Sequence, residues 1–325
     1  MRPNIGPRPG RALRRAALAG LAGGVLILPA VAPAAEPSGA SGAPVPASVL
    51  DRSVRFGHPL VVSGRLGATE AGRAIVLELA PSGHTWQPLV AARVASDGSY
   101  RLRGLPRSSG ELRVRLPAAT QTAASGGAAA SSTGRSSRPQ RVQVAARIAT
   151  RVRQLQLLSG RAVRISGLLL PGRAGRTVRL QARRDGRWQT LARARSSARG
   201  RFSVRLVAHE LGSAPVRLSF AGDRANAASA QASGRLEVFR VSTASWYQLT
   251  GYALGCGGTM GANQLGVANK TLPCGTMVTF RYGGRSVRVP VIDRGPYVAG
   301  REWDLSSATK RALGFPGLGQ LWSSR

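Results

Sequence analysis

Residues 277–297 read MVTFRYGGRSVRVPVIDRGPY, two strand-like runs followed by a turn. The runs, Met277 to Tyr282 and Ser286 to Ile292, are rich in the β-branched and aromatic residues that favour strands. Asp293 follows the second run directly, and Arg294-Gly295-Pro296 is typical of a turn. The pattern therefore predicts a carboxyl group at the end of an apolar strand.

The surrounding region, from Thr243 to Arg325, is dense in glycine and differs in composition from the chain before it. We expect six short β segments here and one helix from Ser306 to Leu313, with the Ser306 side chain as its N-cap. Short strands with one helix predict a compact barrel over residues 243–325.

Acid–base chemistry in this region depends on three carboxyl groups, Asp293, Glu302 and Asp304, because the region contains no histidine. Asp293 is the best candidate for a general acid, since it lies at a strand end beside a turn. Asp304 precedes the expected helix and is assigned a structural role, capping or bracing the helix start through backbone N–H bonds. Glu302, beside Arg301, is expected to be a solvated surface charge.

Five segments of this region occur in an order that is typical of one known domain. They are Ala244-Ser245-Trp246-Tyr247, Leu265-Gly266-Val267-Ala268, Lys270-Thr271-Leu272-Pro273-Cys274-Gly275-Thr276, Val291-Ile292-Asp293-Arg294-Gly295-Pro296-Tyr297 and Trp303-Asp304-Leu305-Ser306. The region resembles the double-psi β-barrel domain of the rare lipoprotein A (RlpA-like) family, over about a quarter of the chain. The resemblance implies a six-stranded double-psi β-barrel with a glycan groove across one face. In active members it also implies lytic transglycosylase action on peptidoglycan, for which no cofactor is expected.

The reaction that the resemblance implies needs only one acid. Asp293 would protonate the glycosidic oxygen between N-acetylmuramic acid and N-acetylglucosamine, and the muramyl 6-hydroxyl would then attack its own anomeric carbon. The products carry 1,6-anhydromuramyl ends. Because the attack is intramolecular, no second carboxylate is required to activate water, unlike ordinary glycoside hydrolysis.

Five further residues are expected to contact the glycan. Asn269 stands where active family members carry a histidine, and asparagine can hydrogen-bond a sugar but cannot titrate. Trp246 and Tyr247 either stack on sugar faces or pack at the barrel edge. Arg294 either orients a lactyl or peptide carboxylate or points into solvent. Tyr297 follows the same turn. The missing histidine leaves two functions open, a lytic transglycosylase and a non-catalytic peptidoglycan-binding barrel.

An internal repeat precedes this region. The matches, all at an offset of 102 or 103 residues, are Ser63-Gly64 with Ser166-Gly167, Gly72 with Gly175, Trp86 with Trp188, and Gly98 with Gly200. Short alternating segments and turn signals predict an all-β fold: two immunoglobulin-like β-sandwich repeats, residues 48–147 and 148–241, before the barrel. We expect residues 118–137 to be a low-complexity loop, and Trp86 and Trp188 to be core residues. Both copies are interpreted as spacers, with carbohydrate- or partner-binding modules as the alternative.

The N-terminus has the pattern of a secretory signal peptide. Three arginines between residues 11 and 15 precede the apolar run Ala16 to Leu28, and Ala32-Pro33-Ala34 supplies a cleavage site. Residues 1–34 are therefore expected to be removed, which leaves no stable membrane span. We expect the protein to be secreted and associated with the cell wall. An uncleaved anchor is the alternative, and it would still place everything downstream outside the cytoplasm. Residues 35–47, rich in Pro, Gly, Ser and Ala, are expected to be a disordered tether.

Export makes a disulfide between the only two cysteines, Cys256 and Cys274, the expected state of the pair. No metal site is expected, because the three histidines lie far along the chain from both cysteines and from one another. They are His58, His84 and His209.

The net charge of +34 comes almost entirely from arginine. Nucleic acid is not an expected partner, because the protein is exported and only 5% of its residues are aromatic. Part of the charge is explained by a GC-rich coding sequence. The rest predicts attraction to anionic cell-wall polymers, besides the peptidoglycan glycan strands that the barrel would bind.

Overall fold

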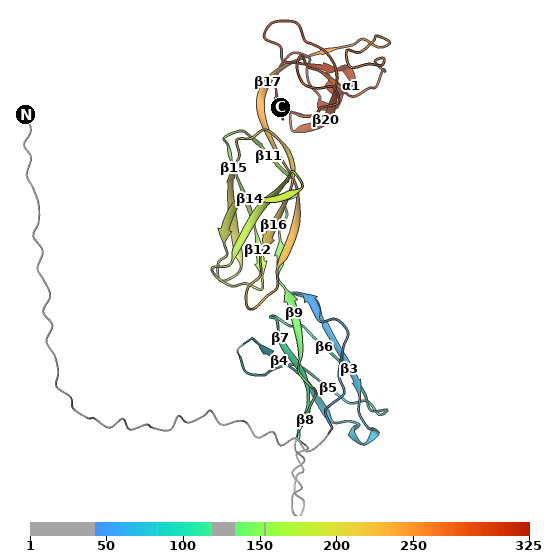
Figure 1. Cartoon of the computed structure of the whole chain (residues 1–325), viewed down its shortest axis with the longest axis vertical. Coiled ribbons are helices and arrows are strands. Elements are labelled where there is room, and N and C mark those ends of the chain that lie inside the picture. Colours follow the sequence, from blue (N-terminus) through green and yellow to red (C-terminus); the bar gives the residue numbers. More distant parts are fainter. Residues whose placement is uncertain (1–42, 83, 119–133, 153) are drawn as a thin grey trace, which may run out of the picture. The chain divides into compact units, whose positions relative to one another are not determined.

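The computed structural model describes residues 43–82, 84–118, 134–152 and 154–325 of the chain (Figure 1). The predicted signal peptide, residues 1–34, lies outside these residues. Within the described ranges, no helix combines the length and apolar character that crossing a membrane requires. Strands make up most of the described structure, which confirms the all-β prediction.

The first copy of the repeat is built from two antiparallel sheets. Its elements are β1 (Ser48–Val49), β2 (Ser53–Arg55), β3 (Leu60–Arg65), the 3-10 turn η1 (Ala68–Glu70), β4 (Ala74–Pro81), β5 (Gln87–Arg93), β6 (Ser99–Gly104), β7 (Gly110–Leu116), β8 (Arg135–Ser136) and β9 (Gln140–Ala145). One sheet has the strand order β1-β3-β6 and the other β2-β9-β7-β4-β5, with β8 paired to β7 and β2 parallel to β9. Alternate residues of β3, β4, β6 and β7 point into one apolar core between the sheets.

The second copy repeats this architecture, except that β8 and η1 have no counterpart in it. Its elements are β10 (Arg147–Ala149), β11 (Gln154–Leu158), β12 (Ala162–Leu170), β13 (Thr177–Arg184), β14 (Arg187–Arg195), β15 (Arg201–Val207), β16 (Gly212–Phe220) and β17 (Ser229–Tyr247). The sheets have the orders β10-β12-β15 and β14-β13-β16-β17, with β11 parallel to β17 as β2 is to β9. The internal repeat is therefore a repeat of structure, and the immunoglobulin-like label stays a prediction.

Two matched glycines of the repeat have the same packing reason. A Cβ atom added to Gly64 would lie 2.5 Å from the Tyr100 hydroxyl oxygen, and one added to Gly167 would lie 2.6 Å from Cζ of Phe202. Such contacts are too short for any side chain. Each glycine therefore leaves room for an aromatic ring to lie across the neighbouring strand.

The two matched tryptophans are not core residues, which corrects the prediction. Trp86 and Trp188 are half-buried and belong to neither apolar core. The guanidinium carbon of Arg113 lies 4.2 Å from the centroid of Trp86, and that of Arg217 lies 4.2 Å from the centroid of Trp188. Arg113 and Arg217 alternate with buried residues along β7 and β16, so each stack lies on the outer face of its sheet.

Two segments predicted to be unstructured contribute to the first sandwich. Val45, expected in the tether, is 2% exposed and lies in the core, and its N–H donates to the Ser136 carbonyl over 3.2 Å. Arg135 and Ser136, expected in the low-complexity loop, form β8. Residues 119–133 of that loop lie outside the described residues.

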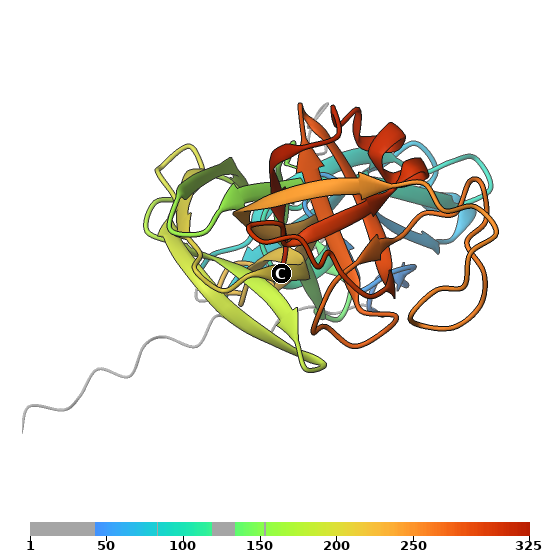
Figure 2. The same cartoon turned by 90° about the horizontal axis from the view of Figure 1, so that it is seen from above.

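The C-terminal region is a closed six-stranded barrel with one helix, as predicted. Its further elements are β18 (Val267–Ala268), β19 (Met277–Tyr282), β20 (Arg285–Asp293), β21 (Trp303–Ser306), α1 (Ser307–Leu313) and β22 (Gly319–Ser323). The pairing order β17-β21-β18-β20-β19-β22 closes because β22 also pairs with β17. Figure 2 shows these strands in orange and red with α1 beside them. The Ser306 hydroxyl caps α1 by accepting the Thr309 N–H over 3.2 Å.

Strand β17 belongs to both the second sandwich and the barrel. Its first part pairs with β11 as far as Phe239, and from Arg240 it pairs with β22. The predicted boundary between residues 241 and 243 therefore falls inside one continuous strand. Hydrogen bonding along a strand switches partners here without any turn, so composition alone could not place the change.

Candidate active site

Asp293 is the last residue of β20, so the predicted strand-end position is confirmed. Its Oδ1 accepts the N–H of Gly255 over 2.7 Å and the N–H of Arg294 over 2.8 Å. The second carboxyl oxygen, Oδ2, takes part in neither bond. Two backbone donors thus fix the orientation of the carboxyl group and leave one oxygen available for proton transfer.

Gly255 is a site residue that the sequence analysis missed. A Cβ atom at this position would lie 2.8 Å from Cγ of Arg294 and 3.0 Å from Oδ1 of Asp293. Only glycine therefore lets the backbone N–H reach the carboxylate. The one available signal was its place next to Cys256, in the glycine-rich segment between β17 and β18.

Asp304 is a strand residue beside Asp293, and this corrects its assignment as a brace for the helix. Ala268 of β18 pairs with Asp293 on one side and with Asp304 on the other. Neighbouring strands lie about 4.8 Å apart, so the two Cα atoms are roughly 10 Å apart. The helix cap is Ser306, whereas Oδ1 of Asp304 accepts the Ser245 hydroxyl over 2.8 Å.

Burial raises the pKa of the Asp304 carboxyl, and the negative charge of Asp293 adds to this effect. The hydrogen bond from Ser245 and the positive charge of Arg301 act in the opposite direction. Folding therefore favours the protonated form of the Asp304 carboxyl group.

Tyr247 lies between these two carboxyl groups. Burial raises the pKa of its phenol, and Asp293 and Asp304 raise it further through their negative charge. A hydrogen bond with Asp293 also raises this pKa, although the buried hydroxyl reaches full hydrogen-bonding geometry with no residue in the described part of the chain. Since Tyr247 and Ser245 are two residues apart in β17, both point to the face that carries Asp304. The phenol is a donor that a bound sugar oxygen could satisfy.

Trp246 points to the opposite face of β17, away from Tyr247. It is 37% exposed, and the Lys310 ammonium lies 3.7 Å from the centroid of its ring. A Cβ atom at Gly317 would come within 2.9 Å of its indole nitrogen. Consecutive strand residues point to opposite faces, so Trp246 and Tyr247 cannot line one groove together. Trp246 instead packs against the end of α1.

Asn269 is buried and fully engaged by its own loop. Its side chain is 7% exposed, and its Oδ1 accepts the N–H groups of Thr271 over 3.1 Å and Leu272 over 2.9 Å. Its Nδ2 donates to the Glu302 carbonyl over 3.4 Å. These bonds hold the turn between β18 and β19, which argues against a direct contact with glycan.

Arg294 braces the same loop, a role that neither of its predicted alternatives includes. Its Nη1 donates to the carbonyls of Asn269 over 3.1 Å and Leu272 over 2.8 Å, and its Nη2 lies 2.8 Å from Sγ of Cys274. The guanidinium therefore faces protein carbonyls. Tyr297, which follows the turn, is 81% exposed and remains accessible to a ligand.

Glu302 is also corrected, since it forms a bidentate ion pair with the guanidinium of Arg240 on β17. The pair ties the segment before β21 to β17. Glu302 is therefore a structural carboxylate, and Asp293 and Asp304 are the two acids of the barrel that face Tyr247.

The predicted disulfide between Cys256 and Cys274 is present. It joins the segment that carries Gly255 to the loop that Asn269 and Arg294 stabilise. The bridge thus anchors the N–H donor that orients Asp293. Asp293, Arg294 and the cysteines form one connected unit, although 37 residues separate Cys256 from Asp293 along the chain.

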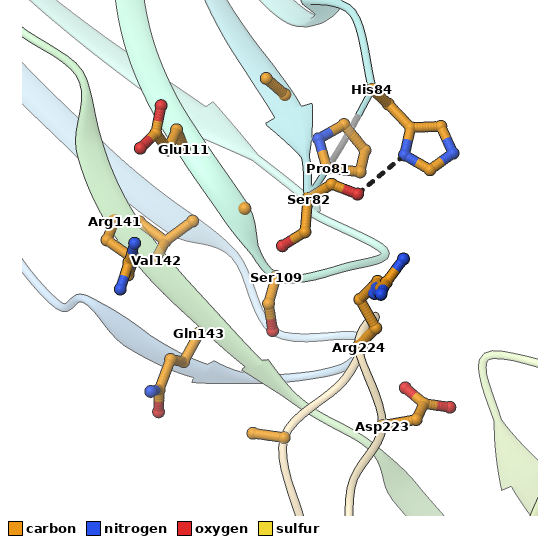
Figure 3. A pocket seen from close by; sticks show the side chains of 13 residues that line it. Pro81, Ser82, His84, Ser109, Glu111, Arg141, Val142, Gln143, Asp223 and Arg224 are labelled. Carbon is orange, nitrogen blue, oxygen red and sulfur yellow. Dashed lines mark hydrogen bonds between the residues drawn. The ribbon is translucent and has the colours of Figure 1, made fainter.

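Another hollow of the molecule contains none of the predicted site residues. It is lined in part by the first sandwich, where His84, Ser109, Glu111 and Arg141 surround it (Figure 3). Nδ1 of His84 lies 3.0 Å from the Ser82 carbonyl, and this contact is the dashed line in the figure. Of its two acids, Glu111 and Asp223, the second is held in an ion pair with Arg176, so the barrel is the better candidate for chemistry.

The C-terminal domain is thus a closed six-stranded barrel that carries Asp293 and Asp304 on the two strands that flank β18, and its fold fits the expected double-psi β-barrel. Residues 240–321 match the family model described as lytic transglycolase. The domain is RlpA-like: it is similar to two proteins named probable endolytic peptidoglycan transglycosylase RlpA.

The first relative, from Aquifex aeolicus (strain VF5), is 40% identical over 75 residues, which are 22% of this chain and 33% of the relative. The second, from Synechocystis sp. (strain ATCC 27184 / PCC 6803 / Kazusa), is 43% identical over 75 residues, 22% of this chain and 23% of the relative. The chain thus spans a third or less of the curated relatives that it matches. Among solved structures, the chain is also similar to a tetra-tandem repeat from the extending region of a large adhesion protein. The match covers 75% of this chain and 63% of the solved chain at 15% sequence identity. Its TM-score of 0.27 is too low to support an argument.

Proposed function

We propose that this is a secreted cell-wall protein whose barrel binds peptidoglycan glycan strands and cleaves them as a lytic transglycosylase. The observation that carries the proposal is the Asp293 carboxyl group, held by two backbone N–H groups beside Tyr247 and Asp304. The names of the two relatives support the same substrate and the same reaction. A wall polymer as substrate places the working protein outside the cytoplasm.

In the proposed reaction, Asp293 transfers its proton to the glycosidic oxygen as the bond between that oxygen and the muramyl C1 breaks. The muramyl 6-hydroxyl attacks C1 and closes the 1,6-anhydro ring. Its proton passes to the Asp293 carboxylate, which restores the acid. Atoms balance without water, so this carboxyl group can serve both steps.

Tyr247 and Asp304 extend the site in a direction that suits a sugar. The unpartnered phenol can donate to a sugar oxygen, and Asp304 can accept from a sugar hydroxyl while Ser245 holds it in place. Substrate binding would satisfy the buried hydroxyl of Tyr247, which otherwise costs free energy. We therefore propose these two residues as substrate contacts, in place of Trp246, Asn269 and Arg294.

Binding without cleavage is the second candidate, and Asn269 is the observation that favours it. Where the family resemblance implies a histidine in active members, this chain has an amide whose Oδ1 accepts two backbone N–H groups and whose Nδ2 donates to a backbone carbonyl. An amide cannot titrate, so acid–base work rests on Asp293 and Asp304 alone.

The test incubates the full chain with purified sacculi and measures anhydromuramyl ends by mass spectrometry. We expect such ends from the wild-type protein and at least about a hundredfold fewer from Asp293→Asn, because a general acid contributes roughly 10²–10⁴-fold. Asp51→Asn, an exposed carboxyl-to-amide change in the first sandwich, is the matched control and should keep the wild-type rate. Pelleting with sacculi and no anhydromuramyl ends would establish the binding function instead.

A further inference from the structure

A broad groove lies over β12 and β15 of the second sandwich. Figure 1 labels these two strands. Its volume is about 1330 Å³, above the roughly 300–1,000 Å³ of most small-molecule pockets. All its lining residues lie between 149 and 203, so one domain forms it alone. They include Arg151, Arg164, Arg195 and Arg201, several serines, and no acid.

The arginines of this groove have no partners among the described residues. None of the four guanidinium groups makes a hydrogen bond or ion pair there, whereas Arg184 and Arg240 each bind a carboxylate. Arg164 also lies directly opposite Arg205 across the β12–β15 pair. Like charges in that position destabilise a sheet, so the arrangement lowers stability and provides unused N–H donors.

The repeat supplies an internal comparison. At the equivalent positions of the first copy, 102 or 103 residues earlier, stand Ser48, Val61, Arg93 and Ser99. Arg93 donates to the Gly72 carbonyl over 2.8 Å, and the exposed Arg65 of that face is paired with Asp97 at 3.1 Å. Coding bias toward arginine acts on both copies equally. The first copy also carries exposed arginines on this face, Arg101 and Arg103. What differs is the groove itself, where Arg151, Arg164 and Arg201 stand at positions that hold no arginine in the first copy.

The spacing of the charges favours a chain-like ligand. On the outer face of β12 and β15, three successive rows pair Arg164 with Arg205, Ser166 with Ser203, and Leu168 with Arg201. At about 3.3 Å per residue, the outer rows are roughly 13 Å apart. One small anion cannot engage both rows fully. The serine hydroxyls, 3.4 Å apart, and the 36% exposed Leu168 between the arginines suit sugar or polyol units.

We propose that this groove binds a linear polymer of sugar or polyol units that bears oxyanions at intervals. The second sandwich is then a binding module for anionic wall polymer, which the first copy is not. Carboxylates and phosphodiesters present the same oxyanion chemistry to arginine. The site works independently of Asp293, so it stands or falls separately from the proposed reaction.

The test measures binding of the full chain to three polymers of similar length by titration calorimetry. Polygalacturonate carries carboxylates, poly(glycerol phosphate) carries phosphodiesters, and dextran is neutral. We expect binding to at least one anionic polymer and none to dextran, and the stronger anionic ligand identifies the oxyanion source. The variant Arg164→Gln/Arg201→Gln should weaken that binding at least tenfold and lower the slope of log K against log salt by about 2.

The matched control is Arg101→Gln/Arg103→Gln, which removes two exposed arginines from β6, the equivalent strand of the first copy. It should change affinity less than about twofold. Equal weakening by both variants would show attraction to net charge alone and overturn the proposal. A second measurement, hydrogen exchange of the wild-type protein, needs no variant. Bound polymer should protect the backbone amides of β12 and β15 from exchange but not those of β3 and β6. If β12 and β15 are not protected, the proposal is also overturned. Asp293→Asn should bind the polymer normally.

Discussion

The Gly255→Ala substitution tests whether the N–H bond to Asp293 matters for the reaction. The new Cβ would lie 2.8 Å from Cγ of Arg294 and 3.0 Å from Oδ1 of Asp293, against ordinary contacts of 3.4–4 Å. The backbone must therefore retreat by several tenths of an ångström, which lengthens and weakens the 2.7 Å hydrogen bond from Gly255 to Asp293. A hydrogen bond to a charged group is worth about 1.5–3 kcal/mol, and each 1.36 kcal/mol is tenfold in rate. We expect anhydromuramyl ends to form about 10- to 100-fold more slowly.

The assay is the initial rate of product formation by the full chain on sacculi, with thermal melting measured in parallel. Gly261→Ala is the matched control, because its Cβ would meet nothing closer than 3.7 Å in the same segment. It should keep the rate within about twofold. If Gly255→Ala melts normally and keeps the wild-type rate, the N–H donor does not orient the acid, and the reasoning fails.

Three further predictions concern stability. Burial raises the pKa of Asp304, so folding favours the protonated form of this carboxyl group. The wild type should therefore lose stability relative to Asp304→Asn as the pH rises through the raised pKa. The two melting temperatures should converge below about pH 3.8, the ordinary pKa of an aspartate. Their running parallel at all pH values would contradict the assignment. Replacing both Cys256 and Cys274 by serine should lower the free energy of unfolding of the barrel by about 3 kcal/mol, because the disulfide closes a loop of 18 residues. Guanidinium titration measures this loss, and an unchanged unfolding midpoint would contradict the prediction. Gly64→Ala should destabilise the first sandwich by about 1–3 kcal/mol by overpacking against Tyr100, whereas Gly67→Ala, with its nearest contact at 3.4 Å, should be nearly neutral in the same titration.

The functional roles show where reasoning from sequence stops. Asp304 was assigned to the helix because it precedes Ser306, yet its carboxyl group accepts the hydroxyl of Ser245 from β17, 59 residues earlier in the chain. Arg294 was expected at a ligand or in solvent, yet its guanidinium binds carbonyls more than twenty residues earlier. In each case a polar side chain takes the partner that folding brings nearby, and sequence spacing holds no record of that partner.

The local sequence pattern by itself determined the strands on either side of residues 283–284, the capped helix and the position of Asp293 at a strand end. It also determined the pairing of the only two cysteines and the repeat of two similar domains. These features depend on alternation, capping and turn chemistry, which act between residues close in sequence. Tertiary structure alone decided that β17 continues into the barrel, that Trp86 and Trp188 lie on outer faces, and that Gly255, Tyr247 and Asp304 converge on Asp293. It also gathered four unpaired arginines on one copy of a repeat. Such convergence results from strand pairing over long separations, where burial and the closure of the sheet choose the neighbours of each side chain.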